Sequence, residues 1–407
     1  MKILVLNSGS SSQKSSLFDV GTTLPEDPPA PAWKGTIEWD GKEAAIDVRN
    51  GRGAKLHERV TVTSRKHAIE QLLNTLWAGE TRAISGPAEI DVVGHRVVHG
   101  GPDYQRPIVI TPEVKSAIAK LSVFAPLHNR AELEGMNIIE EHLGSVRQVA
   151  VFDTAFHRRM PEAAAVYAGP YEWLARGIRR YGFHGINHQY CAGRAAQVVG
   201  KELNSLKIVT CHLGNGCSLA AIQGGRSIDT TMGFTPLEGL MMGTRSGSVD
   251  PGILTYLMQN CEMTGEQLDQ VLNRQSGLLG ISGVSEDMRQ IVAATKQGHV
   301  RAKLAFDIFV HRLRSCMGAM IGVLGGIDVL VFTAGIGENS AEVRAGACAN
   351  FGYMGLRIDP AKNAPCAPDA EISTDDSTVR VLVIAAQEDW AIARECRLLI
   401  GEPATSA

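Results

Sequence analysis

Short apolar runs that end in polar, glycine-rich turns set the pattern of this chain. Residues 3–6 form one such run, which is followed by an Asn-Ser-Gly-Ser-Ser-Ser turn and a second β-type segment up to residue 20. Residues 207–222 repeat the design around a Gly-Asn-Gly turn, and a third run, 329–332, leads into the glycine-bearing stretch 333–339. Each half of the chain is therefore predicted to open with a hairpin, and a third strand is predicted to end in a turn. Three such polar tips are suited to converge on one anion.

Helical periodicity fills the segments between these strands. Apolar positions three or four residues apart predict helices over 67–78, 113–121, 265–273 and 300–324, and Gly325-Gly326 is expected to end the last one. Strands that alternate with helices indicate an α/β protein. Since 407 residues are more than one hydrophobic core usually serves, we expect about two domains with a cleft between them.

Composition narrows the class of protein. The formal charge of −3 and the absence of a long basic run argue against a nucleic-acid partner or an anionic membrane surface. The first apolar run spans only four residues, and no apolar stretch approaches the roughly 20 residues of a membrane span, so we expect no membrane association and a cytoplasmic location. Eight cysteines without CxxC spacing are expected to be reduced thiols.

The stretch from residue 212 to residue 247 indicates the chemistry. Gly214-Asn215-Gly216 offers backbone N–H groups beside polar side chains, and Arg245 lies in a second loop rich in glycine. Bare N–H groups and a guanidinium suit phosphate oxygens and developing negative charge. The stretch therefore indicates phosphoryl transfer.

Two other nucleotide-binding patterns fail on spacing. Around Lys14 the sequence imitates a P-loop but has serine and glutamine in place of both glycines, with β-type sequence following in place of a helix. The run Gly335 to Ser340 has two of the three Rossmann glycines, with Asp359 downstream, but no such loop follows a strand that starts the chain. A P-loop is rejected, and a nicotinamide dehydrogenase is disfavoured.

Motifs along the whole chain, in order, resemble those of the acetate kinase (acetokinase) family. They are the segments 7–12, 94–101, 125–129, 152–157, 180–185, 212–216, 233–239, 241–247, 287–289 and 335–339. The resemblance implies two duplicated actin-like (ribonuclease H-like) α/β domains that flank a nucleotide cleft, with residues 1–152 and 390–407 in the first and 153–389 in the second. It also implies a homodimer, acetate and ATP as substrates, and Mg²⁺ as the metal, for which Mn²⁺ is expected to substitute.

The resemblance implies four catalytic residues. Arg96 and Arg245 would flank the transferring phosphoryl group and the carboxylate, where fork-shaped guanidinium groups can hold spread charge. Asp153, after the apolar run 149–152, would orient acetate or organise the metal and its waters; the alternative is a cap or turn aspartate. His184 would hydrogen bond to phosphoryl oxygens, with a purely structural histidine as its alternative.

Metal and nucleotide residues follow from the same resemblance. The metal residues would be Asn7 and Glu388, although the loop 385–389 departs from the family pattern and leaves Asp389 open as the relevant acid. Serines 10 and 12 would approach the phosphates or only form the turn. The nucleotide would contact Lys14, His212, Leu213, Gly214, Asn215, Gly216, Asp287, Met288, Arg289, Gly335, Ile336, Gly337, Glu338 and Asn339. Met288 stands where phenylalanine is common, so the purine preference stays open.

A small apolar pocket is expected to select the acyl chain. By family position it is formed by Val98, Leu127, Phe183 and Pro236, near the two arginines; the alternative for each of the four is an ordinary core residue. One methylene changes binding in such a pocket by only about 1–3 kcal/mol, so a propionate kinase is the nearest alternative. A catalytically silent actin-like protein that binds nucleotide is the alternative from a different class.

Overall fold

The computed structural model describes residues 1–9, 12–40, 43–62, 64–122, 126–364 and 366–401, without the side chains of Asp40, Pro126, Leu127 and His128. Contacts divide the chain into unit 1, which is Met1–Ala155 with Gln387–Ala407, and unit 2, which is Phe156–Ala386. The chain passes between the units twice, and each predicted domain boundary lies three residues from the boundary in the structure. Asp153 and Glu388 consequently belong to unit 1, whereas the sequence placed them in the second domain, because their side chains bond to residues of unit 1.

Unit 1 is built on a mixed sheet with the strand order β5-β4-β3-β2-β1-β6-β8-β7. β1 to β5 run antiparallel, while β6 and β8 run parallel to β1. The strands are β1 (Lys2–Ser8), β2 (Ser12–Asp19), β3 (Trp33–Asp40), β4 (Glu43–Asn50), β5 (Lys55–Thr61), β6 (Val92–Val97), β7 (Ile108–Val109) and β8 (Arg147–Phe152). Its helices are α1 (Arg65–Asn74), α2 (Pro112–Leu121), α3 (Pro126–Leu143) and α15 (Glu388–Gly401).

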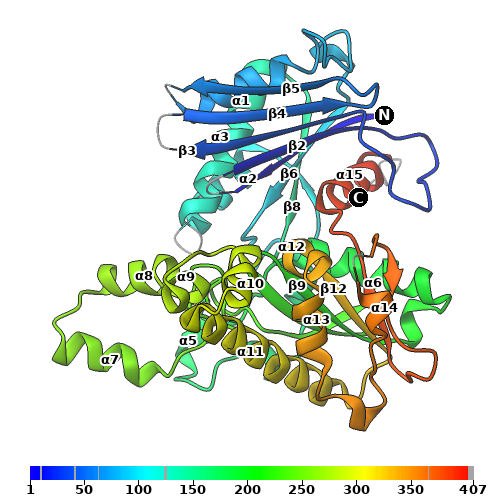
Figure 1. The fold of residues 1–407 in the computed structure, drawn as a ribbon. Helices are drawn as coiled ribbons and strands as arrows, with labels where there is room; N and C mark the ends of the chain where they lie inside the picture. Colours follow the sequence, from blue (N-terminus) through cyan, green and yellow to red (C-terminus); the bar gives the residue numbers. More distant parts are fainter. Residues whose placement is uncertain (10–11, 41–42, 63, 123–125, 365, 402–407) are drawn as a thin grey trace. The chain divides into compact units, whose positions relative to one another are not determined.

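Strand alternation sends neighbouring residues to opposite faces of this sheet. Leu17 and Val93 join a core with α1 and α3. The next residue along β2, Phe18, packs its ring against Trp390 of α15, with centroids 5.6 Å apart. Helices α1 and α3 therefore cover one face, and α15, red in Figure 1, covers the other.

Unit 2 repeats the plan with the strand order β11-β10-β9-β12-β14-β13. A hairpin joins β9 and β10, and β12 and β14 continue the sheet parallel to β9. The strands are β9 (Lys207–Leu213), β10 (Cys217–Gln223), β11 (Arg226–Thr230), β12 (Val329–Thr333), β13 (Ala370–Glu371) and β14 (Arg380–Val383). The two predicted hairpins are confirmed, and the pair β1-β2 corresponds to the pair β9-β10.

The helices of unit 2 lie on both faces of its sheet. They are α4 (Glu162–Ala165), α5 (Glu172–Ala175), α6 (Gly185–Val199), α7 (Pro251–Asn260), α8 (Gly265–Arg274), α9 (Gly277–Ser282), α10 (Met288–Lys296), α11 (Val300–Leu324), α12 (Ala334–Asn339), α13 (Ala341–Cys348) and α14 (Pro360–Asn363). Apolar residues of α6 form one core with β9, β10, β12 and β14. Helix α11 packs on β9, β10 and β11.

Local signals explain the helix ends. Thr111 caps α2 ahead of Pro112, and Thr264 with Gln267 forms a capping box on α8. Gly325 ends α11 in the left-handed region, as predicted from the glycine pair. None of the helices in the described ranges is both long and apolar enough to cross a bilayer.

The predicted turn over 333–339 is wrong, because residues 334–339 form helix α12. Ala334 opens that helix with a φ of 66°. Its N–H donates to Oε1 of Glu338 at 2.9 Å, so a side chain within the helix satisfies one of the donors at the helix start. Glycines and an asparagine are weak helix formers, which is why the sequence pattern indicated a turn.

Candidate active site

In unit 1, the carboxyl ends of parallel strands bring Arg96 and Asp153 together. Arg96 lies near the end of β6, and Asp153 directly follows β8, which runs beside β6 in the same direction. Oδ2 of Asp153 accepts from Nε of Arg96 at 3.0 Å and from Nη2 at 2.5 Å. Asp153 is only 1% exposed, so this charge depends on its partner. Burial lowers the pKa of Arg96, but Asp153 and Glu388 raise it by more, and the guanidinium stays charged.

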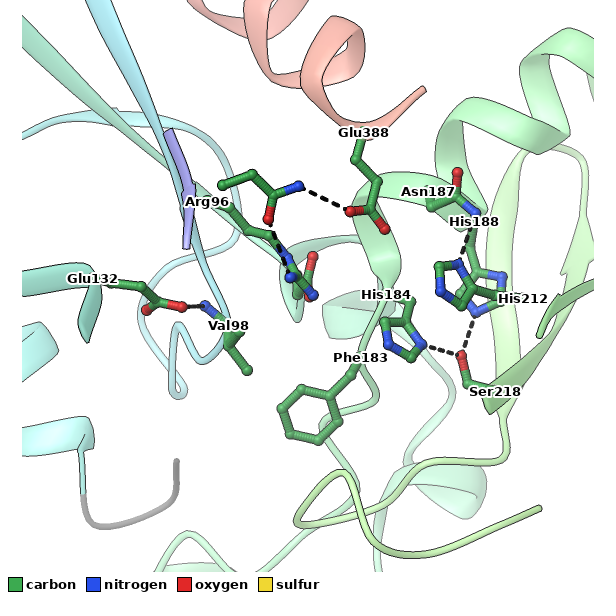
Figure 2. A network of polar contacts seen from close by, with 12 residues as sticks. Arg96, Val98, Glu132, Phe183, His184, Asn187, His188, His212, Ser218 and Glu388 are labelled. Atoms are coloured by element: carbon green, nitrogen blue, oxygen red, sulfur yellow. Dashed lines mark hydrogen bonds and ion pairs between the residues drawn. The ribbon is translucent and has the colours of Figure 1, made fainter. Parts of the chain in front are cut away.

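Asn7 links this ion pair to two acids at the start of α15. Its Oδ1 accepts from Nη1 of Arg96 at 3.3 Å, and its Nδ2 donates to Oε2 of Glu388 at 3.1 Å and to Oδ1 of Asp389 at 3.2 Å. Ser16 donates to the other oxygen of Asp389 at 2.7 Å. Two of the residues that hydrogen bond to Asn7, Arg96 and Glu388, are labelled in Figure 2. The first turn of a helix also favours negative charge.

The oxygen donors of this cluster fit a magnesium ion. Within the residues that the structure covers, no group of three or more His, Cys, Asp or Glu side chains is arranged to hold a metal. Mg²⁺ does not need such a group, because it keeps several waters and binds through one or two carboxylates and substrate phosphates. Glu388 and Asp389 meet that requirement, whereas Asn7 directs its amide nitrogen toward them.

The first hairpin carries Lys14 on the same face as Asn7. The two residues are directly opposite one another in the β1-β2 register, and cross-strand partners share a face. Lys14 is exposed, which leaves its ammonium group accessible to a phosphate. Ser12 begins β2, and Ser10 lies outside the described residues.

Of the predicted acyl pocket, unit 1 holds Val98 and Leu127. Val98 is 4% exposed, and its backbone N–H donates to Oε1 of Glu132 at 3.1 Å. The side chain of Leu127 lies outside the description. Sequence reasoning missed Glu132, whose position on a helix resembles an ordinary polar position of α3.

In unit 2, His184 belongs to a chain of imidazole and hydroxyl groups. Its Nδ1 lies 2.8 Å from Oγ of Ser218, which lies 2.8 Å from Nε2 of His188. Nδ1 of His188 lies 2.7 Å from Oγ1 of Thr210. Burial, with smaller contributions from His157 and His212, lowers the pKa of His188 well below 6.5, so His188 is neutral. Figure 2 shows Ser218 between the two rings.

His212 stacks on His184 at the end of β9. Their ring centroids are 4.0 Å apart with an interplanar angle of 14°. Nδ1 of His212 lies 2.8 Å from Nδ2 of Asn187, an amide that also donates to Thr333 at 3.4 Å. His212 pairs with Thr333 across the parallel strands β9 and β12. The strand ends of unit 2 thus gather the histidines, as those of unit 1 gather charged groups.

The backbone around His184 is held in an unusual conformation. His184 itself has a φ of 56°, in the left-handed region that non-glycine residues rarely adopt. Gly182 has a φ of 74°, and a Cβ there would lie 2.6 Å from Thr230 and 2.7 Å from His157. The carbonyl of Phe183 accepts from Nε2 of His157 at 3.1 Å, and burial lowers the pKa of His157 to about 4. Phe183 is itself 1% exposed.

The two glycine-rich loops meet at the tip of the second hairpin. The N–H of Gly243 donates to the carbonyl of Asn215 at 3.1 Å, and a Cβ on Gly243 would lie 1.8 Å from Oδ1 of Asn215. Arg245 donates from Nη1 to the carbonyl of Pro236 at 2.8 Å. A Cβ placed on Gly216 would lie 3.4 Å from that Nη1 and 3.6 Å from Nε2 of His184. Arg245 and His184 therefore border the same hairpin tip.

Of the residues predicted to contact the nucleotide, three lie at the start of α10. Asp287 caps this helix by accepting from the N–H of Arg289 at 2.8 Å, and the two side chains form an exposed ion pair. Met288 is 3% exposed, so its thioether lies in the core.

The remaining predicted nucleotide residues lie at β9 and α12. Leu213 ends β9 and Gly214 begins the hairpin tip, while α12 contains Gly335, Ile336, Gly337, Glu338 and Asn339. Oε1 of Glu338 accepts from the N–H groups of Ala334 and Ala386. Arg344, which the sequence did not single out, is 1% exposed and donates to the carbonyls of Gly337 and Glu338 at 2.8 Å each.

Comparisons with known proteins agree over the full chain. The profile of the acetokinase family matches residues 2–394. The acetate kinase of Cyanothece sp. (strain PCC 7425 / ATCC 29141) is 58% identical over 402 residues, which cover 98% of this chain and 98% of that protein.

Two solved structures share the fold. The acetate kinase of Porphyromonas gingivalis superimposes with a TM-score of 0.90 at 39% identity, covering 98% of this chain and 99% of that chain. A propionate kinase from Francisella tularensis subsp. tularensis gives a TM-score of 0.88 at 37% identity, covering 97% and 98%. These likenesses confirm the predicted α/β fold of the actin-like type. The chain belongs to the acetokinase family and is an enzyme of the phosphotransferase class.

Proposed function

We propose that this enzyme is an acetate kinase, which transfers the γ-phosphoryl group of ATP reversibly to acetate and forms acetyl phosphate and ADP by direct in-line transfer. The observation that carries the proposal is the buried ion pair of Arg96 and Asp153 beside Asn7 and Glu388. A protein that only binds nucleotide has no need of a buried cation that can receive a carboxylate. The curated relatives at 55–59% identity are named acetate kinase, which supports the same choice.

Arg96 is the proposed partner of the acetate carboxylate. Its three hydrogen bonds, to Asp153 and Asn7, leave two of the five guanidinium N–H donors without a partner in the described part of the chain. Two like charges about 4 Å apart repel by roughly 4 kcal/mol at an effective dielectric of 20, so acetate and ATP need such a cation between them. Asp153 holds the guanidinium in place and is the proposed orienting acid.

Arg245 and His184 are proposed to stabilise the phosphoryl group in the transition state. Both border Gly216, whose hairpin tip supplies backbone N–H groups for phosphate oxygens. A guanidinium that meets three equatorial oxygens neutralises charge that spreads as the bond to ADP breaks.

The hydroxyl network provides a reason for His184 to act as a donor. Phosphoryl oxygens only accept, so a neutral His184 must carry its proton on Nε2 and accept at Nδ1. Ser218 then donates to His184 and accepts from Nε2 of His188. Nδ1 of His188 in turn accepts from Thr210. Every hydroxyl donates once in this order, so the buried residues support the donor tautomer at no cost in unsatisfied groups.

Glu388 and Asp389 would hold Mg²⁺, with Mn²⁺ as a substitute, and Asn7 would orient both acids. When bound, the ion would neutralise charge on the β- and γ-phosphates and order its waters. Lys14, on the same sheet face as Asn7, is proposed to contact a phosphate.

The proposed nucleotide site uses His212 to Gly216, Asp287, Arg289 and the α12 segment 335–339. Asp287 and Arg289 are exposed or partly so, and they can contact a ligand while they cap α10. Met288 is buried and is proposed to support this site from the core instead of stacking on the base.

Acetate is preferred over propionate in this proposal, with propionate as the second candidate. The four apolar residues proposed to select the acyl group are taken from family position and are Val98, Leu127, Phe183 and Pro236. The structural likeness to a propionate kinase is the observation that favours propionate as the second candidate substrate. The predicted homodimer and cytoplasmic location stay predictions.

The test is acyl phosphate formation from Mg·ATP with acetate, propionate and butyrate in parallel, with the product trapped as its hydroxamate. The highest kcat/KM on acetate is expected. A clear preference for propionate would reassign the acyl group and keep the chemistry. No product from any of the three acids, with nucleotide still bound, would overturn the proposal.

A further inference from the structure

One buried acid near the proposed acyl site has no assigned task. Glu132, on α3 of unit 1, is 1% exposed. Its Oε1 accepts the backbone N–H of Val98 at 3.1 Å, while Oε2 makes no hydrogen bond within the part of the chain that is described. A buried carboxylate oxygen without a partner is costly, whereas a carboxylic acid lowers that cost by giving up its charge. The bond from Val98 to Glu132 is drawn in Figure 2.

The charged groups around Glu132 come from three other segments. Arg96 lies on β6, Asp153 follows β8, and Arg65 begins α1. Burial raises the pKa of Glu132 most strongly, Arg96 and the Val98 N–H lower it, Asp153 raises it, and Arg65 lowers it. The balance raises the pKa of Glu132 from 4.5 to about 8. Arg65 has the smallest effect of these groups on the pKa of Glu132, and its guanidinium also pairs with Glu134 at 4.0 Å.

We propose that Glu132 is a positioning residue of the acyl site that works as the neutral acid, fixing Val98 through its backbone N–H without adding a negative charge beside Arg96. This inference rests on the proposed function. Arg96 already faces Asp153 and Glu388, so the carboxylate of the substrate competes with two anions for it. Ionisation of Glu132 would add a third anion and weaken binding of the acyl substrate.

The prediction is a pH dependence in one kinetic parameter. Acetate is ionised throughout the range from about pH 6 to about pH 9.5, so its own charge does not change. With Mg·ATP saturating, the KM for acetate should rise on the order of tenfold as Glu132 loses its proton near pH 8, while kcat changes little. A residue that only fills space would leave this profile unchanged.

The variant that tests the proposal is Glu132→Gln, which stays neutral and keeps an oxygen for the Val98 N–H. Its KM for acetate should remain flat across the same pH range. Glu134→Gln is the matched control, since Glu134 lies on the same helix but has a side chain that is 41% exposed and pairs with Arg65. The control should keep the rise of the wild-type enzyme. A rise that persists in Glu132→Gln would overturn the proposal.

A second readout needs no turnover. A folded-state pKa raised above the unfolded value gives stability that is complete below about 4.5 and is lost as pH rises toward about 8. The difference in Tm between Glu132→Gln and the wild type should therefore grow in favour of the variant over this range and level off above it. A difference that does not change with pH would refute the neutral acid. If no acid is turned over, this curve still reports on Glu132, so the two proposals can fail separately.

Discussion

The two units share one strand plan yet place opposite kinds of chemistry at the ends of their parallel strands. In unit 1 these strand ends carry buried charges, namely Arg96, Asp153 and the acids at the start of α15. In unit 2 they carry imidazoles and hydroxyls, among them the neutral His188, with the half-buried Arg245 beside them. The difference teaches that a duplicated fold fixes where side chains gather and leaves their chemistry free. Ion pairing positions the side chains of the first region, whereas the order of hydrogen-bond donors and acceptors positions those of the second.

The largest expected effect separates the two arginines. Arg96→Ala and Arg245→Ala should each lower kcat by about 10³-fold or more, as for arginines that meet a transferring phosphoryl group. Only Arg96→Ala removes a buried ion pair, the one with Asp153, so it should also cost about 3–5 kcal/mol in the free energy of unfolding. Steady-state kinetics and urea denaturation measure both. Near-normal turnover in either variant would remove that residue from the mechanism, and equal stability losses would break the comparison between the units.

Variants of the two acids at the start of α15 test the charged cluster of unit 1. Glu388→Gln should lower kcat by about 10²-fold at fixed Mg²⁺ and raise the Mg²⁺ concentration needed for half-maximal rate, because a charged oxygen ligand is lost. Asp389→Asn should have a smaller kinetic effect, since Asp389 also accepts from Ser16 and holds α15 in place. Mg²⁺ titrations of the rate test this order. The reverse order would make Asp389 the principal ligand.

The hydroxyl of Ser218 tests the hydrogen-bond network of unit 2. Ser218→Ala removes the group between His184 and His188 and should lower kcat about tenfold, the equivalent of roughly 1.4 kcal/mol. Ser227→Ala is the matched control, because Ser227 is also buried and lies 2.8 Å from a histidine, His157, outside this chain of groups. The control should keep kcat within about twofold. Equal losses in both variants would reduce the network to a packing effect.

Sequence motifs identified the functional residues that lie within a recognisable stretch of sequence. Family motifs contain all four predicted catalytic residues, Arg96, Asp153, His184 and Arg245. Both hairpins were predicted from apolar runs that end in polar turns. Sequence reasoning missed Glu132, Ser218 and Thr210. Each of them bonds to a residue more than 20 positions away in the chain, and only the packing of strands and helices brings the two together. The loop 385–389 left two acids open, and only the contacts to Asn7 and Ser16 distinguish their surroundings. Helix α12 was mistaken for a turn, since the carboxylate that caps it comes from within a glycine-rich segment.

The smallest expected effect concerns Arg289. Its side chain is 88% exposed and pairs with the nearby Asp287, so Arg289→Ala should leave the free energy of unfolding almost unchanged. A rise in the KM for ATP without a change in kcat would support its place in the nucleotide site. An unchanged KM for ATP would remove it from that site.

The central claim is direct transfer from ATP to a carboxylate, with charged groups and neutral donors serving one step. The measurement that tests it most directly is turnover of acetate with ATP made chiral at the γ-phosphorus by oxygen isotopes, followed by analysis of the acetyl phosphate formed. A single in-line displacement predicts inversion at phosphorus. Retention would contradict the account, because it requires a second displacement through a phosphorylated enzyme.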